Sequence, residues 1–283
     1  MVRRLQPSTP AATAPAPATA ILEPPALNPQ SSTTAVAPAN HPTFAMTPEL
    51  AKAFALSGST QTQPELVEGV GTPYVMFYDK RAEQASKIAA KLPHVAAGDP
   101  ILVVAGDYEA VKSTAFVILD EFQFWVESDT ATFKPVAWRL DQPAGKGDWK
   151  EQVLCLLLLL TDEPILTLTT LRTTKCPVAK SMRKAVQHAQ TPEAIKGDTF
   201  LGAMVQANFP PRYRVTGSFV TTPKSGKFAY VEADARCATT KPEQGVAIMN
   251  WFASPEGQDE HKLLRAAFDE QVADVRKKAA AKR

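Results

Sequence analysis

Basic side chains gather in one half of the central part of this 283-residue sequence. Between Pro164 and Tyr230 there are ten Lys or Arg against two Asp or Glu, whereas the stretch from Asp99 to Glu163 has five against twelve. The local net charges are therefore +8 and −7, although the whole chain has a formal net charge of only +2. This distribution predicts a local anion-binding surface rather than a strongly cationic protein.

The candidate binding residues combine these cations with aromatic side chains. They are Arg172, Lys175, Lys180, Arg183, Lys184, Arg212, Tyr213, Arg214, Lys224, Lys227, Phe228, Tyr230, Trp125 and Trp138. Cations bind phosphates, and aromatic rings stack on unpaired bases whatever their identity. The combination predicts a surface for single-stranded nucleic acid. The alternative is an ordinary solvated basic surface with the aromatic side chains in the core.

No motif for catalysis, metal binding or nucleotide binding competes with this interpretation. The Walker A, GxGxxG, HExxH and GxSxG patterns are absent. Asp120 and Glu121 are neighbours in a predicted strand and therefore point to opposite faces. Glu232 and Asp234 would share a face, which leaves a two-carboxylate metal site open, but no His lies near them in sequence. We therefore expect a protein that is not an enzyme and has no metal or other cofactor.

The three cysteines form neither a disulfide framework nor a zinc-binding pattern, because they are widely separated. Cys155 lies within a leucine run and is expected in the core. Cys176 stands where a helix is expected to begin, a position that can stabilise a thiolate. A reactive Cys176 and a Cys176 that only packs against its neighbours are both open at this point.

Composition divides the chain into three parts. Residues 1–68 are Pro-, Ala- and Thr-rich, with nine of the 24 prolines before residue 45, and we expect them to be disordered apart from a short helix at 47–56. Residues 69–240 carry strand patterns, and residues 241–283 carry helical ones. No signal-peptide pattern occurs, and the longest apolar run, Val153–Leu160, is far shorter than the roughly 20 residues of a membrane-spanning helix. We expect a cytoplasmic protein with no membrane association.

Strand patterns dominate the central part. After a first apolar, strand-like run at 73–79, we expect strands at 101–106, 114–127, 135–141, 152–161, 165–170, 212–222 and 227–238, the last two joined as a hairpin by the turn PKSG. The run VLCLLLLL is apolar on both faces, which predicts a central strand covered on both sides. If Asp120 marks a bend or bulge, one face of the strand at 114–127 would carry Phe116, Ile118, Phe122, Phe124 and Val126. Helices are expected at 81–92, 177–190, 198–207, 243–253 and 255–282.

These elements predict an α+β fold with mainly antiparallel β-structure: an OB-like barrel with an inserted helix, C-terminal helices and a disordered N-terminal tail. The order VLCLLLLLTD, a turn, LTLTTLRTTK and a Lys-rich helix resembles OB-fold single-stranded-DNA-binding proteins of phages and mobile elements, over about residues 70–240. The resemblance implies non-catalytic binding of single-stranded DNA in replication, recombination or repair, with RNA not distinguished. That family has an acidic C-terminal tail, whereas this sequence ends RKKAAAKR. Expected partners are single-stranded nucleic acid, further copies of the chain, and replication or recombination proteins.

A second class of function fits the same residues. In a phage or mobile-element structural or protein-interaction module, the basic strand-to-helix junction would be a surface feature and the N-terminal tail a tether. The two hypotheses differ in one measurable property, because only the first predicts oligonucleotide binding that weakens with salt.

Overall fold

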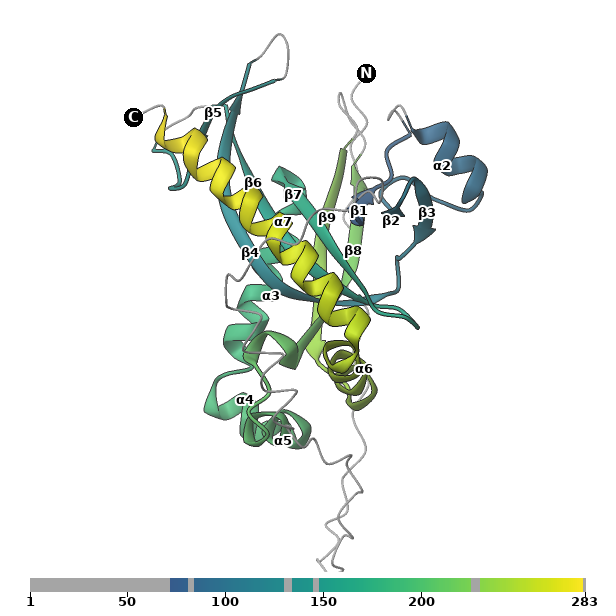
Figure 1. Ribbon diagram of the computed structural model, residues 1–283, viewed down its shortest axis with the longest axis vertical. Coiled ribbons are helices and arrows are strands. Elements are labelled where there is room, and N and C mark those ends of the chain that lie inside the picture. Colours follow the sequence, from purple (N-terminus) through teal and green to yellow (C-terminus); the bar gives the residue numbers. More distant parts are fainter. Residues whose placement is uncertain (1–71, 81–83, 130–133, 145–147, 225–229, 282–283) are drawn as a thin grey trace, which may run out of the picture. The chain divides into compact units, whose positions relative to one another are not determined.

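The computed structural model describes residues 72–80, 84–129, 134–144, 148–224 and 230–281 (Figure 1). The predicted disordered tail, residues 1–68, lies outside these ranges. The strands are β1 (Tyr74–Phe77), β2 (Pro100–Val104), β3 (Asp107–Ala110), β4 (Ala115–Ser128), β5 (Pro135–Arg139), β6 (Trp149–Leu160), β7 (Ile165–Arg172), β8 (Val215–Lys224) and β9 (Tyr230–Thr239). The helices are α2 (Ala85–Lys91), α3 (Pro177–His188), α4 (Pro192–Gly197), α5 (Thr199–Gln206), α6 (Pro242–Ala253) and α7 (Pro255–Ala280), with the short 3₁₀ helices η1 (Thr173–Lys175) and η2 (Pro211–Arg214).

The described strands form two sheets, and each strand pairing is antiparallel. The larger sheet has the order β7-β6-β4-β8-β9, with β5 also pairing with β4, and the smaller has the order β1-β2-β3. The predicted α+β class with mainly antiparallel strands is therefore confirmed. A closed barrel is not observed among the described strands, because β7 and β9 end the larger sheet without pairing with each other.

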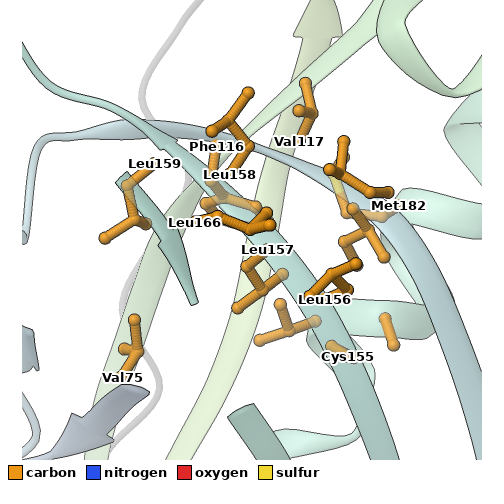
Figure 2. Packing of buried hydrophobic residues seen from close by; sticks show 14 of the residues in the cluster. Val75, Phe116, Val117, Cys155, Leu156, Leu157, Leu158, Leu159, Leu166 and Met182 are labelled. Atoms are coloured by element: carbon orange, nitrogen blue, oxygen red, sulfur yellow. The ribbon is translucent and has the colours of Figure 1, made fainter. Parts of the chain in front are cut away.

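The leucine run forms the centre of the core. Strand β6 lies between β4 and β7, and every residue from Val153 to Leu159 is buried. Figure 2 shows the leucines of β6 packed with Phe116 and Leu166 of the neighbouring strands and Met182 of α3. Burying one such side chain contributes roughly 1.5–3 kcal/mol. The predicted central position of this strand is confirmed.

Helices α3 and α7 cover opposite faces of the larger sheet, here named the α3 face and the α7 face. Two neighbouring residues of β4 demonstrate this, because adjacent side chains of a strand point to opposite faces. Glu121 binds Arg183 of α3, whereas Asp120 binds Arg265 of α7. Because both faces are covered, the leucines of β6 are buried whichever face they point to.

A β-bulge in β4 changes which of its side chains share a face. Ile118 and Asp120 are opposite neighbouring residues of β6, so Leu119 is an extra residue. The bulge predicted near Asp120 is confirmed. The prediction that the apolar residues of this strand share one face is wrong, because one extra residue inverts the alternation. Phe116 consequently lies on the α3 face and Phe122 on the α7 face.

Gly217 of β8 allows α3 to approach the sheet closely. A Cβ atom at this position would lie 2.6 Å from Sδ of Met182 and 2.8 Å from Cζ of Phe116. Both neighbours are buried, with exposed fractions of 2 % and 0 %, and neither can move aside into solvent. An added Cβ would therefore force Met182 or Phe116 to shift within a closely packed interface.

We expect Gly217→Ala to lower the free energy of unfolding by about 1–3 kcal/mol, because the added methyl group overpacks the interface between α3 and the sheet. Gly197→Ala is the control, since nothing lies within 4 Å of its added Cβ. Its effect should stay within about 0.5 kcal/mol. Urea unfolding followed by tryptophan fluorescence measures both variants. Equal stabilities would contradict the close approach.

Strand β1 lies between two strands of the larger sheet that are far apart in its order. On one side the backbone N–H of Leu168 in β7 donates to the carbonyl of Pro73 at 2.9 Å. On the other side Phe77 packs edge-to-face on Phe219 of β8, with ring centroids 5.6 Å apart. The smaller sheet thus packs between the β7 end and the β8 side of the open larger sheet.

The β8–β9 hairpin begins later than predicted. Strand β8 starts at Val215, and the preceding residues form η2. Pro210 and Pro211 have no N–H to donate and a fixed φ, so they cannot continue a strand ladder. The three residues that follow them, Arg212 to Arg214, therefore do not alternate across a strand as predicted.

Helix α7 packs on the sheet through one apolar stripe. Its buried side chains recur every three or four residues and include His261, Leu264, Phe268, Val272 and Val275. The hydroxyl of the N-cap residue Ser254 accepts from the N–H of Gly257 at 3.0 Å and fixes the start of the helix. Figure 1 shows the helix crossing the larger sheet, with its last turns near β5.

Candidate functional site

The cations predicted on α3 bind carboxylates of the sheet beneath them. Lys180 Nζ lies 2.6 Å from Oε2 of Glu151, and Arg183 Nε lies 2.7 Å from Oε1 of Glu121. The bond to Glu121 raises the pKa of Arg183. Both carboxylates are largely covered, with side-chain exposed fractions of 19 % and 15 %. Lys180 and Arg183 therefore neutralise carboxylates of the acidic strands, and these ion pairs compete with binding of a phosphate.

The residues of η2 also make contacts within the protein. Arg212 lies 3.1 Å from Asp120, whose other oxygen is 2.7 Å from Arg265. Arg214 donates from Nε to the carbonyl of Phe209 at 2.6 Å, and burial lowers its pKa. Tyr213 is 5 % exposed and packs on other aromatic rings of the core. The assignment of Tyr213 to a base-stacking surface is thus corrected, because its ring faces no solvent.

The described residues beside the hairpin tip bind one another. Lys224 pairs with Glu232 at 3.2 Å, and the hydroxyl of Tyr230 donates to the same carboxylate at 3.4 Å. Tyr230 is 45 % exposed and remains accessible. Lys227 and Phe228 lie outside the described residues. The described part of the tip is therefore not the basic surface that the sequence predicted.

Three predicted cations have no ion-pair partner within the described part of the chain, but they do not gather in one place. Lys184 is exposed on α3, and Lys175 is partly buried in η1, where desolvation lowers its pKa. Arg172 is exposed at the end of β7, opposite Gln152 of β6 on the α7 face. The strand-to-helix junction thus divides its cations between the two faces of the sheet.

The two predicted tryptophans also lie on opposite faces. In the register of β4 and β5, Trp125 is opposite Arg139, and Trp138 is opposite the next residue of β4, Val126. Adjacent pairs of a ladder point to opposite sides, so the two indoles cannot contribute to one surface. Trp138 shares the α7 face with Arg172, and Trp125 does not.

The structure brings a different set of residues together on the α7 face, here named the α7-end surface. Strands contribute two aromatic rings and two cations, and the last turns of α7 contribute two further cations. The set consists of Phe122, Trp138, Lys150, Arg172, Arg276 and Lys278. Arg276 lies over the ring of Phe122, 5.4 Å from its centroid, and Lys278 over that of Trp138 at 5.2 Å.

The strand register fixes the spacing of this surface. Trp138 and Lys150 are both opposite Val126, from the two sides of β4, so their backbones are about 10 Å apart. Arg172 stands one strand beyond Lys150 and is displaced by two residues along the ladder. Within the described residues Lys150, Arg172 and Arg276 pair with no carboxylate, whereas Lys278 pairs with Asp274. The α7-end surface therefore presents uncompensated cations beside partly exposed rings.

Sequence reasoning missed four of the six residues of this surface, namely Phe122, Lys150, Arg276 and Lys278. Lys150 lies in the acidic stretch Asp99–Glu163, whose local net charge of −7 did not indicate a cationic surface. Arg276 and Lys278 have an ordinary explanation as cations that stabilise the C-terminus of a helix. The available signal was alternation, since Lys150 and Gln152 share a strand face with every second residue of the leucine run.

A hollow elsewhere in the fold has the opposite charge. Its volume is about 610 Å³, and its lining includes Asp162 and Glu163 of the β6–β7 turn, Glu243 of α6, and Glu256 and Glu260 of α7. Burial raises the pKa of Glu260, which accepts from the indole N–H of Trp251 at 3.3 Å. Five carboxylates around one hollow repel phosphate, so this hollow is unsuited to a nucleic-acid backbone.

The alternative sites considered from the sequence find no support in the geometry. Burial raises the pKa of Cys176 to about 12, and its thiol donates to the carbonyl of Leu171 at 3.5 Å, so it is not a thiolate. Asp234 accepts from Ser181 at 2.6 Å, while Glu232 binds Lys224. Across the described ranges no three His, Cys, Asp or Glu side chains are grouped to hold a metal ion.

No protein-family model matches the sequence, and the comparisons with curated proteins and with solved structures returned no similar protein. The fold and surface define an α+β protein with mainly antiparallel sheets and a cation- and aromatic-bearing sheet face. In the part of the chain that the structure describes, no helix is both long and apolar enough to cross a membrane.

Proposed function

We propose that this protein binds single-stranded nucleic acid, and single-stranded DNA in particular, without catalysing a reaction on it. The observation that carries the proposal is the α7-end surface, where exposed cations stand beside the rings of Phe122 and Trp138 on one sheet face. Cations bind the backbone phosphates, and the rings offer stacking surfaces to bases.

The composition of the surface favours single strands over a duplex. Stacking on a ring requires an unpaired base, because paired bases are already stacked on their neighbours. Four cations are too few to give the tight, purely electrostatic binding of a strongly basic duplex-binding protein. Roles in replication, recombination or repair, within a phage or mobile element, belong to the same proposal.

An OB-like relationship is also part of the proposal. It is supported by the order of strands, by helix α3 as the first of the three α-helices between β7 and β8, and by the contacts of β1 with both β7 and β8. Oligonucleotide binding by OB folds uses a sheet face and adjoining loops, which is consistent with a site on the α7 face.

Fluorescence anisotropy with labelled oligo-dT at several salt concentrations tests the proposal. Four phosphate contacts predict that log K falls with log salt with a slope of about −2.8. A duplex of equal length is expected to bind more weakly, and oligo-U distinguishes RNA from DNA. Absence of binding at low salt, or binding that is independent of salt, would favour a structural or protein-interaction module instead.

A further inference from the structure

The last turns of α7 have few fixed contacts. Val275 is the last buried residue of the helix, and none of the residues from Arg276 to Ala281 is buried. The described contacts of this segment with the sheet include the two cations that lie over rings. A cation over a ring at an exposed site is worth only roughly 2- to 5-fold in an equilibrium constant.

The segment occupies the ring faces that a base would need. Lys278 lies over Trp138 and Arg276 over Phe122, so neither ring is fully open while α7 keeps this position. Base stacking on an aromatic side chain is worth roughly 5- to 150-fold per base. A base can therefore replace a cation on a ring, provided that the cation finds a new partner.

We infer that the end of α7 is an exchangeable cover of the α7-end surface. When no strand is bound, Lys278 and Arg276 occupy the faces of Trp138 and Phe122. When a strand binds, bases take these ring faces and the two cations move to backbone phosphates. This inference rests on the proposed function and adds a mechanism by which one set of side chains protects the rings and then holds the ligand.

The exchange explains why cations and rings are paired on this surface. An uncovered pair of aromatic rings would be an apolar patch open to non-specific contact. Arg276 has no carboxylate partner among the described residues, so its charge is available to a phosphate. Lys278 pairs with Asp274 at the helix surface. Both of these side chains are about half exposed, so this ion pair is weak.

Two oligonucleotides and two variants test the inference. The oligonucleotides are oligo-dT and an abasic strand of the same length, which keeps the phosphates but offers no base. Trp138→Leu removes a ring and keeps an apolar side chain, while Arg276→Met with Lys278→Met removes both charges and keeps the apolar stems. The double variant Lys87→Met with Lys196→Met is the charge-matched control, because these cations are exposed on α2 and α4.

Trp138→Leu is expected to weaken oligo-dT binding roughly 5- to 150-fold and to leave abasic-strand binding unchanged. Arg276→Met/Lys278→Met is expected to reduce the salt slope by about 1.4, the contribution of two phosphate contacts, and to retain the preference for oligo-dT over the abasic strand. The control pair is expected to change neither quantity.

Four results would overturn the inference. Equal losses for both strands in Trp138→Leu would make Trp138 a packing residue only. A salt slope of Arg276→Met/Lys278→Met equal to that of the unmodified protein would mean that the cations stay on the rings. Because Arg276 and Lys278 are exposed and follow the last buried residue of α7, this variant is expected to fold. Failure of the unmodified protein to bind either strand would remove the proposed function and the inference together, whereas binding of both strands without preference would remove the inference alone.

Discussion

Replacing Arg172 with Met is expected to weaken oligo-dT binding by roughly 10- to 150-fold and to leave folding stability nearly unchanged. The estimate corresponds to the loss of one charge-assisted hydrogen bond to a phosphate, worth about 1.5–3 kcal/mol. Arg172 is exposed, has no described carboxylate partner, and lies on the same face as Trp138. Within the described ranges, the protein therefore loses no ion pair with this side chain.

Arg183→Met should have the opposite profile. Arg183 holds the largely covered carboxylate of Glu121, whose Oε2 atom is already without a hydrogen-bond partner. Removing the guanidinium leaves this carboxylate uncompensated and should lower the free energy of unfolding by about 1–2 kcal/mol, a figure reduced because Arg183 is itself 38 % exposed. Binding of oligo-dT should change little.

The two variants control for each other, because each removes one positive charge from the same basic stretch of the sequence. Anisotropy titration at constant salt measures binding, and urea unfolding measures stability. Equal losses of affinity would place the nucleic-acid site around both residues, as the sequence alone predicted. A loss for Arg183→Met only would place it on the α3 face.

Lowering the pH from 6.5 to about 4 is expected to reduce the free energy of unfolding by about 3 kcal/mol through His261 alone. This side chain is 6 % exposed and packs against Trp251 and Phe252. Burial, with a smaller effect of nearby Arg265, lowers its pKa from 6.5 to about 4. Its folded state therefore contains the neutral imidazole, and protonation is much easier in the unfolded chain.

The sign follows from the direction of this shift. Above pH 6.5 the imidazole is neutral in both states, and its contribution to stability is fully present. Between pH 6.5 and about 4 only the unfolded chain takes up the proton, so stability falls with pH. Glu260 acts in the opposite direction, because burial raises the pKa of its carboxyl group.

His261→Phe separates the two effects, since phenylalanine keeps an aromatic ring in the cluster and cannot titrate. Urea unfolding of both proteins between pH 7 and pH 4 should give stability curves that diverge below pH 6.5. Parallel curves would show that His261 is accessible to protons in the folded state.

Local patterns were sufficient for the elements that depend on local physics. Alternation and apolar runs predicted the long strands of the larger sheet, including the leucine-rich β6, but not β3, and the spacing of apolar residues predicted α7. The predicted bulge near Asp120 is present, but it places Phe116 and Phe122 on opposite faces, and the prediction that they share one face is wrong. Two adjacent prolines also shortened β8, because they replace the start of a regular ladder by η2.

The sequence by itself determined the α+β class, the central leucine strand and the amphipathic helices, because periodicity and side-chain volume act over a few residues. Only the tertiary structure decided which cations remain available. Glu121 and Arg183 are 62 residues apart and Glu151 and Lys180 are 29 apart, yet each pair meets between β-sheet and helix. The acidic and basic stretches thus neutralise one another across the α3 face, whereas Lys150, Arg172 and Arg276 meet on the α7 face without described carboxylate partners. Coulomb interactions depend on distance in space, and distance in sequence does not determine it.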